Sequence, residues 1–182
     1  MKADWSPHTV SNLSLPQLLQ PNLVAPGTLA ELPLHQLLAQ GIRALVLDVD
    51  RTLLPRRGSE LPPAVEAWLR RAQQTLPLHL FSNNPSRSRI GAVADQLGVS
   101  YTTSAGKPRR GPLRRVIEQL DLPHSQVAIV GDRVFTDVLA GNRLGLYTVL
   151  VKPVNPEGEP CPHDHWQRLE VQLARLAGAT LS

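Results

Sequence analysis

The chain has 182 residues, of which 42% are hydrophobic and 4% are aromatic. This length favours one folded domain, and this composition excludes a disordered chain. The formal net charge is +4, a mild basic excess that suits an anionic partner without requiring one. Cys161 is the single cysteine, which excludes an intrachain disulfide. We therefore expect a cytoplasmic protein with no disulfide-linked partner.

Residues 5–30 carry no Asp, Glu, Lys or Arg, and four prolines interrupt them. This stretch is too broken for one long helix. We expect residues 1–40 to form an arm that packs on the core. The alternative is peripheral membrane contact through apolar side chains of the arm, namely Trp5, Leu13, Leu15, Leu18, Leu19 and Leu23. No apolar run approaches the ~20 residues that a membrane span needs, and no signal peptide is recognisable.

From residue 42 onward, short apolar runs alternate with amphipathic segments. Such alternation predicts parallel strands joined by helical crossovers, in an α/β three-layer sandwich with a central parallel sheet. Residues 41–182 are expected to form one catalytic domain. The predicted strands are 42–47, 76–81, 99–102, 126–130 and 147–151, and the predicted helices are 63–74, 86–97, 111–120, 134–144 and 164–177.

Polar residues gather where the predicted strands end, at the edge where open parallel sheets bind ligands. Asp48 and Asp50 follow the first strand, and Asp132 follows the fourth. Carboxylates placed so closely repel one another unless a cation or a shared proton offsets the repulsion. An open cluster of oxygens suits Mg²⁺, and one carboxylate could attack phosphorus while another handles protons. An aspartate pair that merely caps a turn is the simpler alternative.

Ser82 and Asn83 follow the second strand where a helix begins, a place suited to a phosphate oxygen or to an ordinary helix cap. Lys107 lies between glycine and proline, and it could neutralise a phosphate or be an ordinary exposed lysine. Asp137 could orient Lys107 or a metal-bound water. Alternatively, it could be an acid in the first turn of a helix, where the helix dipole favours a negative charge.

These segments together resemble the haloacid dehalogenase (HAD) superfamily of phosphohydrolases. The first motif reads Asp48-Val49-Asp50-Arg51-Thr52-Leu53, the second matches at Ser82, the third at Lys107, and the fourth at Gly131-Asp132 with Asp137. All four motifs occur in the order expected for the superfamily, and together they cover roughly residues 42–152. The longer stretches 80–84, 105–108 and 131–148 resemble subclass IIIA, the YqeG-type branch that includes phosphatidylglycerophosphate phosphatases. Arg51 stands where that family often has Asn or Gly.

The resemblance implies a role for each matching residue. Asp48 is expected as nucleophile and Mg²⁺ ligand, and Asp50 as general acid and base with a backbone carbonyl on the metal. Thr52, Ser82 and Asn83 are expected to bind the phosphoryl group together with Lys107, which also stabilises charge. The metal set is Asp48, Asp50, Asp132 and Asp137, with Mg²⁺ as cofactor.

The spacing between motifs leaves no room for an inserted cap domain, which predicts an open site. An open site suits a phospholipid headgroup, so phosphatidylglycerophosphate is the leading substrate. Basic residues at 56–57 and 109–115 could face an anionic membrane or simply be solvated. A soluble sugar-phosphate or nucleotide phosphatase is the second candidate. A basic nucleic-acid-binding module is the third, but no aromatic stacking platform is visible, so no nucleic acid partner is expected.

Overall fold

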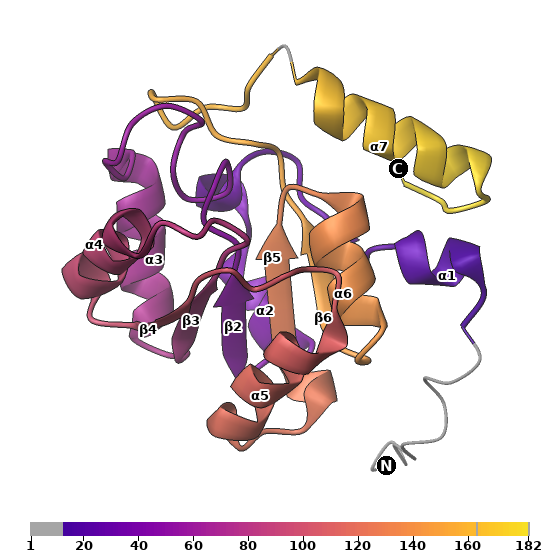
Figure 1. Cartoon of the computed structure of the whole chain (residues 1–182), viewed down its shortest axis with the longest axis horizontal. Helices are drawn as coiled ribbons and strands as arrows, with labels where there is room; N and C mark the ends of the chain where they lie inside the picture. Colours follow the sequence, from indigo (N-terminus) through magenta and orange to yellow (C-terminus); the bar gives the residue numbers. More distant parts are fainter. Residues whose placement is uncertain (1–12, 163, 182) are drawn as a thin grey trace.

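The computed structural model describes residues 13–162 and 164–181, which are built around a six-stranded parallel sheet (Figure 1). The strand order is β1-β6-β5-β2-β3-β4. The expected α/β fold with a central parallel sheet is confirmed. The strands are β1 (Leu23–Val24), β2 (Ala44–Leu47), β3 (Leu78–Phe81), β4 (Ser100–Thr102), β5 (Val127–Gly131) and β6 (Tyr147–Leu150).

Helical segments connect the strands, and local sequence explains several of their ends. The helix α4 begins where the Ser86 hydroxyl accepts a hydrogen bond from the Arg89 N–H, and it ends at Gly98 with φ of 68°. The helical segments are α1 (Leu15–Leu19), η2 (Leu29–Glu31), α2 (Leu34–Ala39), α3 (Pro63–Gln73), α4 (Arg87–Leu97), α5 (Arg110–Leu120), η3 (His124–Gln126), η4 (Val134–Val138), α6 (Leu139–Asn142) and α7 (His165–Leu176).

The segment predicted as one helix over 134–144 is divided in the structure. Its first five residues form the π-helix η4, and only Leu139–Asn142 are α-helical. The wider π-turn changes the direction in which side chains leave the backbone, so 3.6-residue periodicity does not describe it. Such turns are frequent at functional sites, and η4 directly follows β5.

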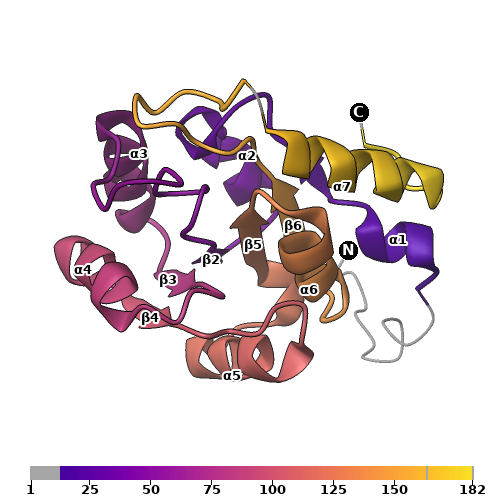
Figure 2. The ribbon, with the colours of Figure 1, turned by 45° about the horizontal axis from the view of Figure 1, so that its top comes forward.

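Apolar side chains alternate between the two faces of the sheet and bury both. From β2, Leu45 and Leu47 join a core beneath α2, α3 and α4. Ala44 and Val46 point the other way, into a core beneath α5 and α6. The helices therefore cover the sheet on both faces, which gives the three layers visible in Figure 2.

The described part of the N-terminal segment adds β1 to the sheet beside β6. The Asn22 side-chain oxygen accepts a 2.8 Å hydrogen bond from the Thr148 N–H. The buried Asn142 amide, on α6, ties α1 to the same region, because it donates to the carbonyls of Gln17, Leu18 and Gln20. Residues 13–40 are thus held against the rest of the chain.

The apolar residues proposed for membrane contact in this segment have different environments. Leu19 is buried in a core that includes residues of η4 and α7, whereas Leu15 is 58% exposed. Trp5 lies outside the described residues. No helix in the described ranges combines the length and the apolar character that crossing a membrane requires.

The C-terminal helix α7 lies against η4 and α1 (Figure 1). It carries a stripe of exposed apolar side chains. Its buried side carries Glu170 and Ala174. The stripe consists of Trp166, Leu169, Leu173 and Leu176, which are 59%, 46%, 46% and 85% exposed. The spacing of three, four and three residues places these side chains on one face of the helix.

Candidate active site

The predicted site residues lie at the carboxyl edge of the sheet, between its two central strands. Asp48 directly follows β2 and Asp132 directly follows β5, and these strands are parallel neighbours. From β2 the sheet continues through β3 and β4 on one side and through β5 and β6 on the other. This is the change of strand order at which open α/β sheets form their binding crevice.

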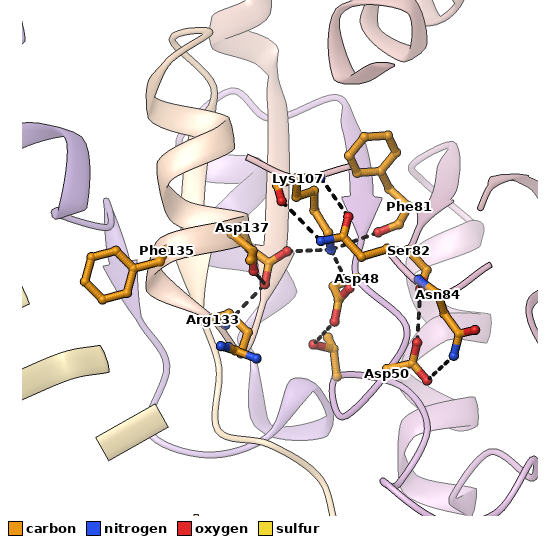
Figure 3. A network of polar contacts seen from close by, with 12 residues as sticks. Asp48, Asp50, Phe81, Ser82, Asn84, Lys107, Arg133, Phe135 and Asp137 are labelled. Carbon is orange, nitrogen blue, oxygen red and sulfur yellow. Dashed lines mark hydrogen bonds and ion pairs between the residues drawn. The ribbon is translucent and has the colours of Figure 1, made fainter. Parts of the chain in front are cut away.

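Lys107 occupies the centre of the site and connects three elements. It is only 6% exposed, and its ammonium group donates hydrogen bonds to one oxygen of Asp48, to Asp137 at 2.6 Å and to the Phe81 carbonyl at 3.0 Å (Figure 3). The other Asp48 oxygen accepts a 3.1 Å hydrogen bond from the Thr52 hydroxyl. The structure therefore brings Asp48, Thr52, Lys107 and Asp137 together, as predicted from the motif positions.

Burial and neighbouring charges alter the protonation of this cluster. Burial is the largest influence on Asp48 and, with the nearby Asp137 charge, raises its pKa to about 6 despite the opposing effect of Lys107. Burial alone would lower the pKa of Lys107, but the charges of Asp137 and Asp48 outweigh burial and raise that pKa above its ordinary value. The lysine therefore stays charged, and its single positive charge is shared between two carboxylates.

Asp132 has an unsatisfied carboxylate oxygen, which is the clearest indication of a cation site. Asp132 is 1% exposed, and no described residue donates a hydrogen bond to its Oδ2, although Arg51 Nε lies 3.3 Å away. Burial, followed by the charges of Asp48 and Asp137, raises the pKa of Asp132 well above its ordinary value.

Oxygens of Asp48, Asp132 and Asp137 all lie within 4.8 Å of one another. Such a buried, oxygen-only cluster with an orphaned acceptor fits a hard divalent cation such as Mg²⁺. The three residues could therefore hold a metal ion.

The carboxyl group of Asp50 has a separate environment from that of Asp48. It accepts hydrogen bonds from the Ser82 hydroxyl at 3.0 Å, from the Asn84 amide at 3.3 Å and from Arg89 Nε at 3.2 Å. Figure 3 shows Asp50 beside Asn84, whereas Asp48 points to Lys107. The side chain of Asp50 is outside the three-carboxylate cluster, so any contact with the metal would use its backbone.

Asn83 supports the Lys107 loop rather than presenting its side chain freely. Its amide donates to the Lys107 carbonyl at 3.2 Å, and its side-chain oxygen accepts from the Lys107 N–H at 2.7 Å. Ser82 similarly both donates to Asp50 and accepts from the Asn84 N–H at 3.0 Å. Both residues predicted to bind phosphate thus lie at the site, and both also position its loops.

Gly131 is required by the close approach of Asp137. A Cβ atom at residue 131 would overlap the Asp137 carboxyl group, so only glycine leaves room for that side chain. The second oxygen of Asp137 accepts hydrogen bonds from the Arg133 N–H at 3.2 Å and the Thr136 hydroxyl at 3.3 Å. Asp137 is thereby fixed with one oxygen toward Lys107.

Sequence reasoning missed two charged residues that organise the site. Arg89 forms an ion pair with Asp50. The sequence contained a signal for this role, because an arginine in the first turn of a helix is disfavoured by the helix dipole. Glu170 on α7 accepts hydrogen bonds from Arg133 Nε at 2.7 Å and from the Val134 N–H at 2.9 Å. The feature of the sequence that could have revealed Glu170 is its position as an acidic residue on the face of an amphipathic helix opposite the apolar stripe.

Comparisons with known proteins indicate the family of this chain. A family model described as HAD-hydrolase-like matches residues 104–157. The "Probable phosphatase YqeG" of Bacillus subtilis is 29% identical over 121 residues, which cover 66% of this chain and 70% of that protein. Chloroplastic phosphatidylglycerophosphate phosphatase 1 of Chlamydomonas reinhardtii is 32% identical over 158 residues. That match covers 79% of this chain and 56% of the algal protein, so the chain spans about half the length of that relative.

A solved structure of an uncharacterized protein from Listeria monocytogenes has the same fold. Its TM-score is 0.52 at 18% identity, and the match covers 68% of this chain and 84% of that one. The chain belongs to the haloacid dehalogenase-like hydrolases. The chain is a phosphatase of that superfamily, and the relatives that it resembles are named as a probable phosphatase and a phosphatidylglycerophosphate phosphatase.

Proposed function

We propose that this phosphatase hydrolyses a phosphate monoester through an aspartyl-phosphate on Asp48, and that its substrate is phosphatidylglycerophosphate. The observation that supports the mechanism best is the position of Asp48. Its carboxylate lies at the change of strand order, where a buried lysine and a threonine hydroxyl fix both of its oxygens. A carboxylate fixed in this way is oriented for attack on a bound phosphoryl group.

In the first step, an Asp48 oxygen forms a bond to phosphorus while the bond between phosphorus and the leaving alcohol oxygen breaks. Asp50, in its protonated form, gives its proton to that oxygen. In the second step, Asp50 takes a proton from water, whose oxygen attacks phosphorus and releases Asp48 and inorganic phosphate. Lys107 offsets the negative charge that develops, and its position is fixed by Asp137.

Magnesium is part of the proposal because the carboxylates fit it. Asp48, Asp132 and Asp137 would hold Mg²⁺, with the backbone carbonyl of Asp50 as a further ligand suggested by the family resemblance. The bound ion would offset the charge of the carboxylates and of the phosphate oxygens. Asp132 Oδ2, to which no described residue donates a hydrogen bond, supports this assignment.

The lipid assignment rests on the relatives and on the openness of the site. The Chlamydomonas relative is named for phosphatidylglycerophosphate. Between Asp48 and Ser82 the chain forms only a loop, α3 and β3, so no inserted domain covers the carboxyl edge there. We place the protein at a membrane surface, in contact through the exposed apolar stripe of α7.

Phosphate release in Mg²⁺ and in EDTA tests the proposal, with phosphatidylglycerophosphate in mixed micelles beside glycerol 3-phosphate and a nucleotide. We expect release from the lipid that EDTA abolishes and that Asp48→Asn lowers at least a thousandfold, the order of loss known for nucleophiles. The matched control is Asp95→Asn, which alters an exposed aspartate of α4. Activity on soluble esters alone would refute the lipid substrate, and full activity of Asp48→Asn would refute the mechanism.

A further inference from the structure

A hollow beside the carboxylate cluster is lined by three arginines and a tryptophan. The hollow has a volume of about 300 Å³, is open to solvent, and is lined by Arg51, Arg56, Arg133 and Trp166. A neighbouring hollow of about 290 Å³ shares Arg51, Arg56 and Trp166, and its lining also includes Cys161, Pro162, Asp164 and His165. These side chains come from the loop after β2, the loop after β5 and the start of α7, so three separate elements build the hollow.

The hollow adjoins the residues proposed for catalysis. Arg51 Nε lies 3.3 Å from the Asp132 carboxylate, and Arg133 follows Asp132 in the chain. The backbone N–H of Arg133 is hydrogen-bonded to Asp137. A substrate whose phosphoryl group is at Asp48 would therefore extend its leaving group within reach of this hollow.

The three arginines differ in how their charges are already used. Arg51 forms ion pairs with Asp132 and Asp164, and Arg133 forms one with Glu170. Arg56 is exposed, and it makes no hydrogen bond or ion pair within the described ranges. The paired arginines keep their positions, and the guanidinium of Arg56 remains available to an anion.

Arg51 also has an unusual backbone conformation. Its φ of 72° lies in the left-handed region, where glycine and asparagine are favoured and arginine is disfavoured. The side chain of Arg51 nevertheless lines the hollow, where its Nε lies 3.3 Å from the Asp132 carboxylate. A strained backbone at a residue that lines a site is consistent with a role for its side chain there.

We propose that Arg51, Arg56 and Arg133, with Trp166, form a second anion subsite that recognises a phosphodiester on the leaving alcohol. This deepens the proposed phosphatase function and rests on it. The ligand class is an organic bisphosphate in which a short polyol links the reacting monoester to a second phosphate, which is a diester. Guanidinium groups suit that second phosphate, and the indole ring of Trp166 offers a face for the linking carbon atoms.

Two water-soluble substrates, one with and one without the diester, test this subsite. Glycerophosphoglycerol phosphate and glycerol 3-phosphate both carry the reacting phosphate on a glycerol unit, but only the former has a phosphodiester on that unit. We expect Arg56→Gln to lower the ratio of kcat/KM for the diester compound to that for glycerol 3-phosphate about tenfold, which corresponds to about 1.4 kcal/mol. Arg56→Lys should lower the ratio less, because the charge remains while the planar donor group is lost.

The neighbouring Arg57→Gln variant is the matched control, because Arg57 is exposed and lines neither hollow. It should leave the ratio unchanged. An unchanged ratio in Arg56→Gln, or an equal fall in Arg57→Gln, would overturn the subsite. A fall seen with phosphatidylglycerophosphate in micelles but not with the soluble diester would also overturn it, since attraction to the lipid surface would then explain the effect.

Binding without turnover separates this proposal from the catalytic one. Calorimetry with glycerophosphoglycerol phosphate and the Asp48→Asn protein, with and without Arg56→Gln, should show affinity weakened about tenfold by the second substitution. Equal affinities would overturn the subsite whatever the activity of the enzyme. Weakened binding in a protein that shows no turnover on any ester would support the subsite and refute the proposed function instead.

Discussion

Asp132 illustrates a conflict between stability and metal binding at a single residue. Its buried carboxylate lies near those of Asp48 and Asp137, and one of its oxygens has no hydrogen-bond donor among the described residues. Burying such a charge without a donor destabilises the folded chain. Lys107 and Arg51 offset the three carboxylates only in part, so a bound cation would make the arrangement more favourable.

We predict opposite effects of Asp132→Asn on the metal-free and the Mg²⁺-loaded protein. Without metal, the substitution removes charge repulsion and should raise the free energy of unfolding by about 1 kcal/mol. With excess Mg²⁺, the wild type should gain stability and the variant should gain little. Thermal unfolding in EDTA and in a Mg²⁺ series measures both effects. A variant stabilised by Mg²⁺ as strongly as the wild type would contradict the assignment of Asp132 as a ligand.

Arg89 is expected to position the carboxyl group of Asp50. It holds Asp50 Oδ1 at 3.2 Å and also donates to the Pro55 carbonyl at 3.1 Å, so it links the proposed acid to the following loop. We predict that Arg89→Gln lowers kcat about tenfold for glycerol 3-phosphate and much less for p-nitrophenyl phosphate. Nitrophenolate leaves without needing a proton, whereas an alkoxide depends on the general acid.

The control for this prediction is Arg87→Gln, on the same helix turn but without a contact to Asp50. Equal losses on both esters in Arg89→Gln would assign a purely structural role to Arg89. Partial rescue by Arg89→Lys would support the positioning role, because lysine keeps the charge but cannot reproduce the forked contacts.

Much of the site could be predicted from the sequence because its residues follow strands. Asp48 and Asp132 directly follow parallel strands, and Lys107 lies on the loop after β4. The ends of parallel strands converge by topology alone. The contacts of Arg89 and Glu170 could not be predicted, because both residues lie on helices whose rotation about their axes depends on tertiary packing. The use of the Asn83 amide to hold the Lys107 loop likewise depends on how closely the two loops approach.

At the scale of elements, the strands were predicted better than the N-terminal segment. The apolar runs of β2, β3, β5 and β6 are long enough to be recognised before any packing is known. The two-residue β1 has no such run, and its pairing with β6 depends on a contact between distant parts of the chain. For α7, amphipathicity predicted the helix, but the larger apolar residues face outward while Glu170 is buried.

The junction of β3 and β4 contains a buried histidine that should make stability depend on pH. His79 is 4% exposed, and its ring nitrogens lie 2.7 Å and 2.9 Å from the hydroxyls of Ser100 and Thr102. Burial lowers its pKa from 6.5 to about 4. In the unfolded chain this imidazole gains a proton below pH 6.5, whereas in the folded chain it stays neutral until about pH 4.

Stability should therefore fall as the pH decreases from about 6.5 to about 4, by up to about 3 kcal/mol from this residue. His79→Gln should flatten the slope of the unfolding free energy against pH within that window. Urea unfolding at several pH values measures the slope, and His35→Gln, on the surface of α2, is the control. A slope that is the same in wild type and His79→Gln would show that His79 is not responsible.

At the scale of the whole molecule, the apolar stripe of α7 and the arginine-lined hollow share Trp166. We predict that Leu169→Ser combined with Leu173→Ser weakens binding to vesicles containing phosphatidylglycerol about tenfold, because less apolar surface enters the lipid interface. Hydrolysis of glycerol 3-phosphate should be unaffected. Vesicle sedimentation measures the binding.

The control for this prediction is Leu38→Ser, at a leucine of α2 that is 41% exposed. Equal binding of the wild type and the double variant would exclude α7 as the lipid contact. If the wild type self-associated in analytical ultracentrifugation and the double variant did not, the stripe would instead be an interface between two copies of the chain.

The pairing of β1 with β6 has a consequence for biosynthesis. Asn22 and Thr148, which are hydrogen-bonded beside these strands, are 126 residues apart in sequence. At about 5–20 residues per second, a ribosome needs roughly 6–25 s to make the intervening chain. During that interval β1 cannot pair with β6, so this edge of the sheet closes only when most of the protein has been translated.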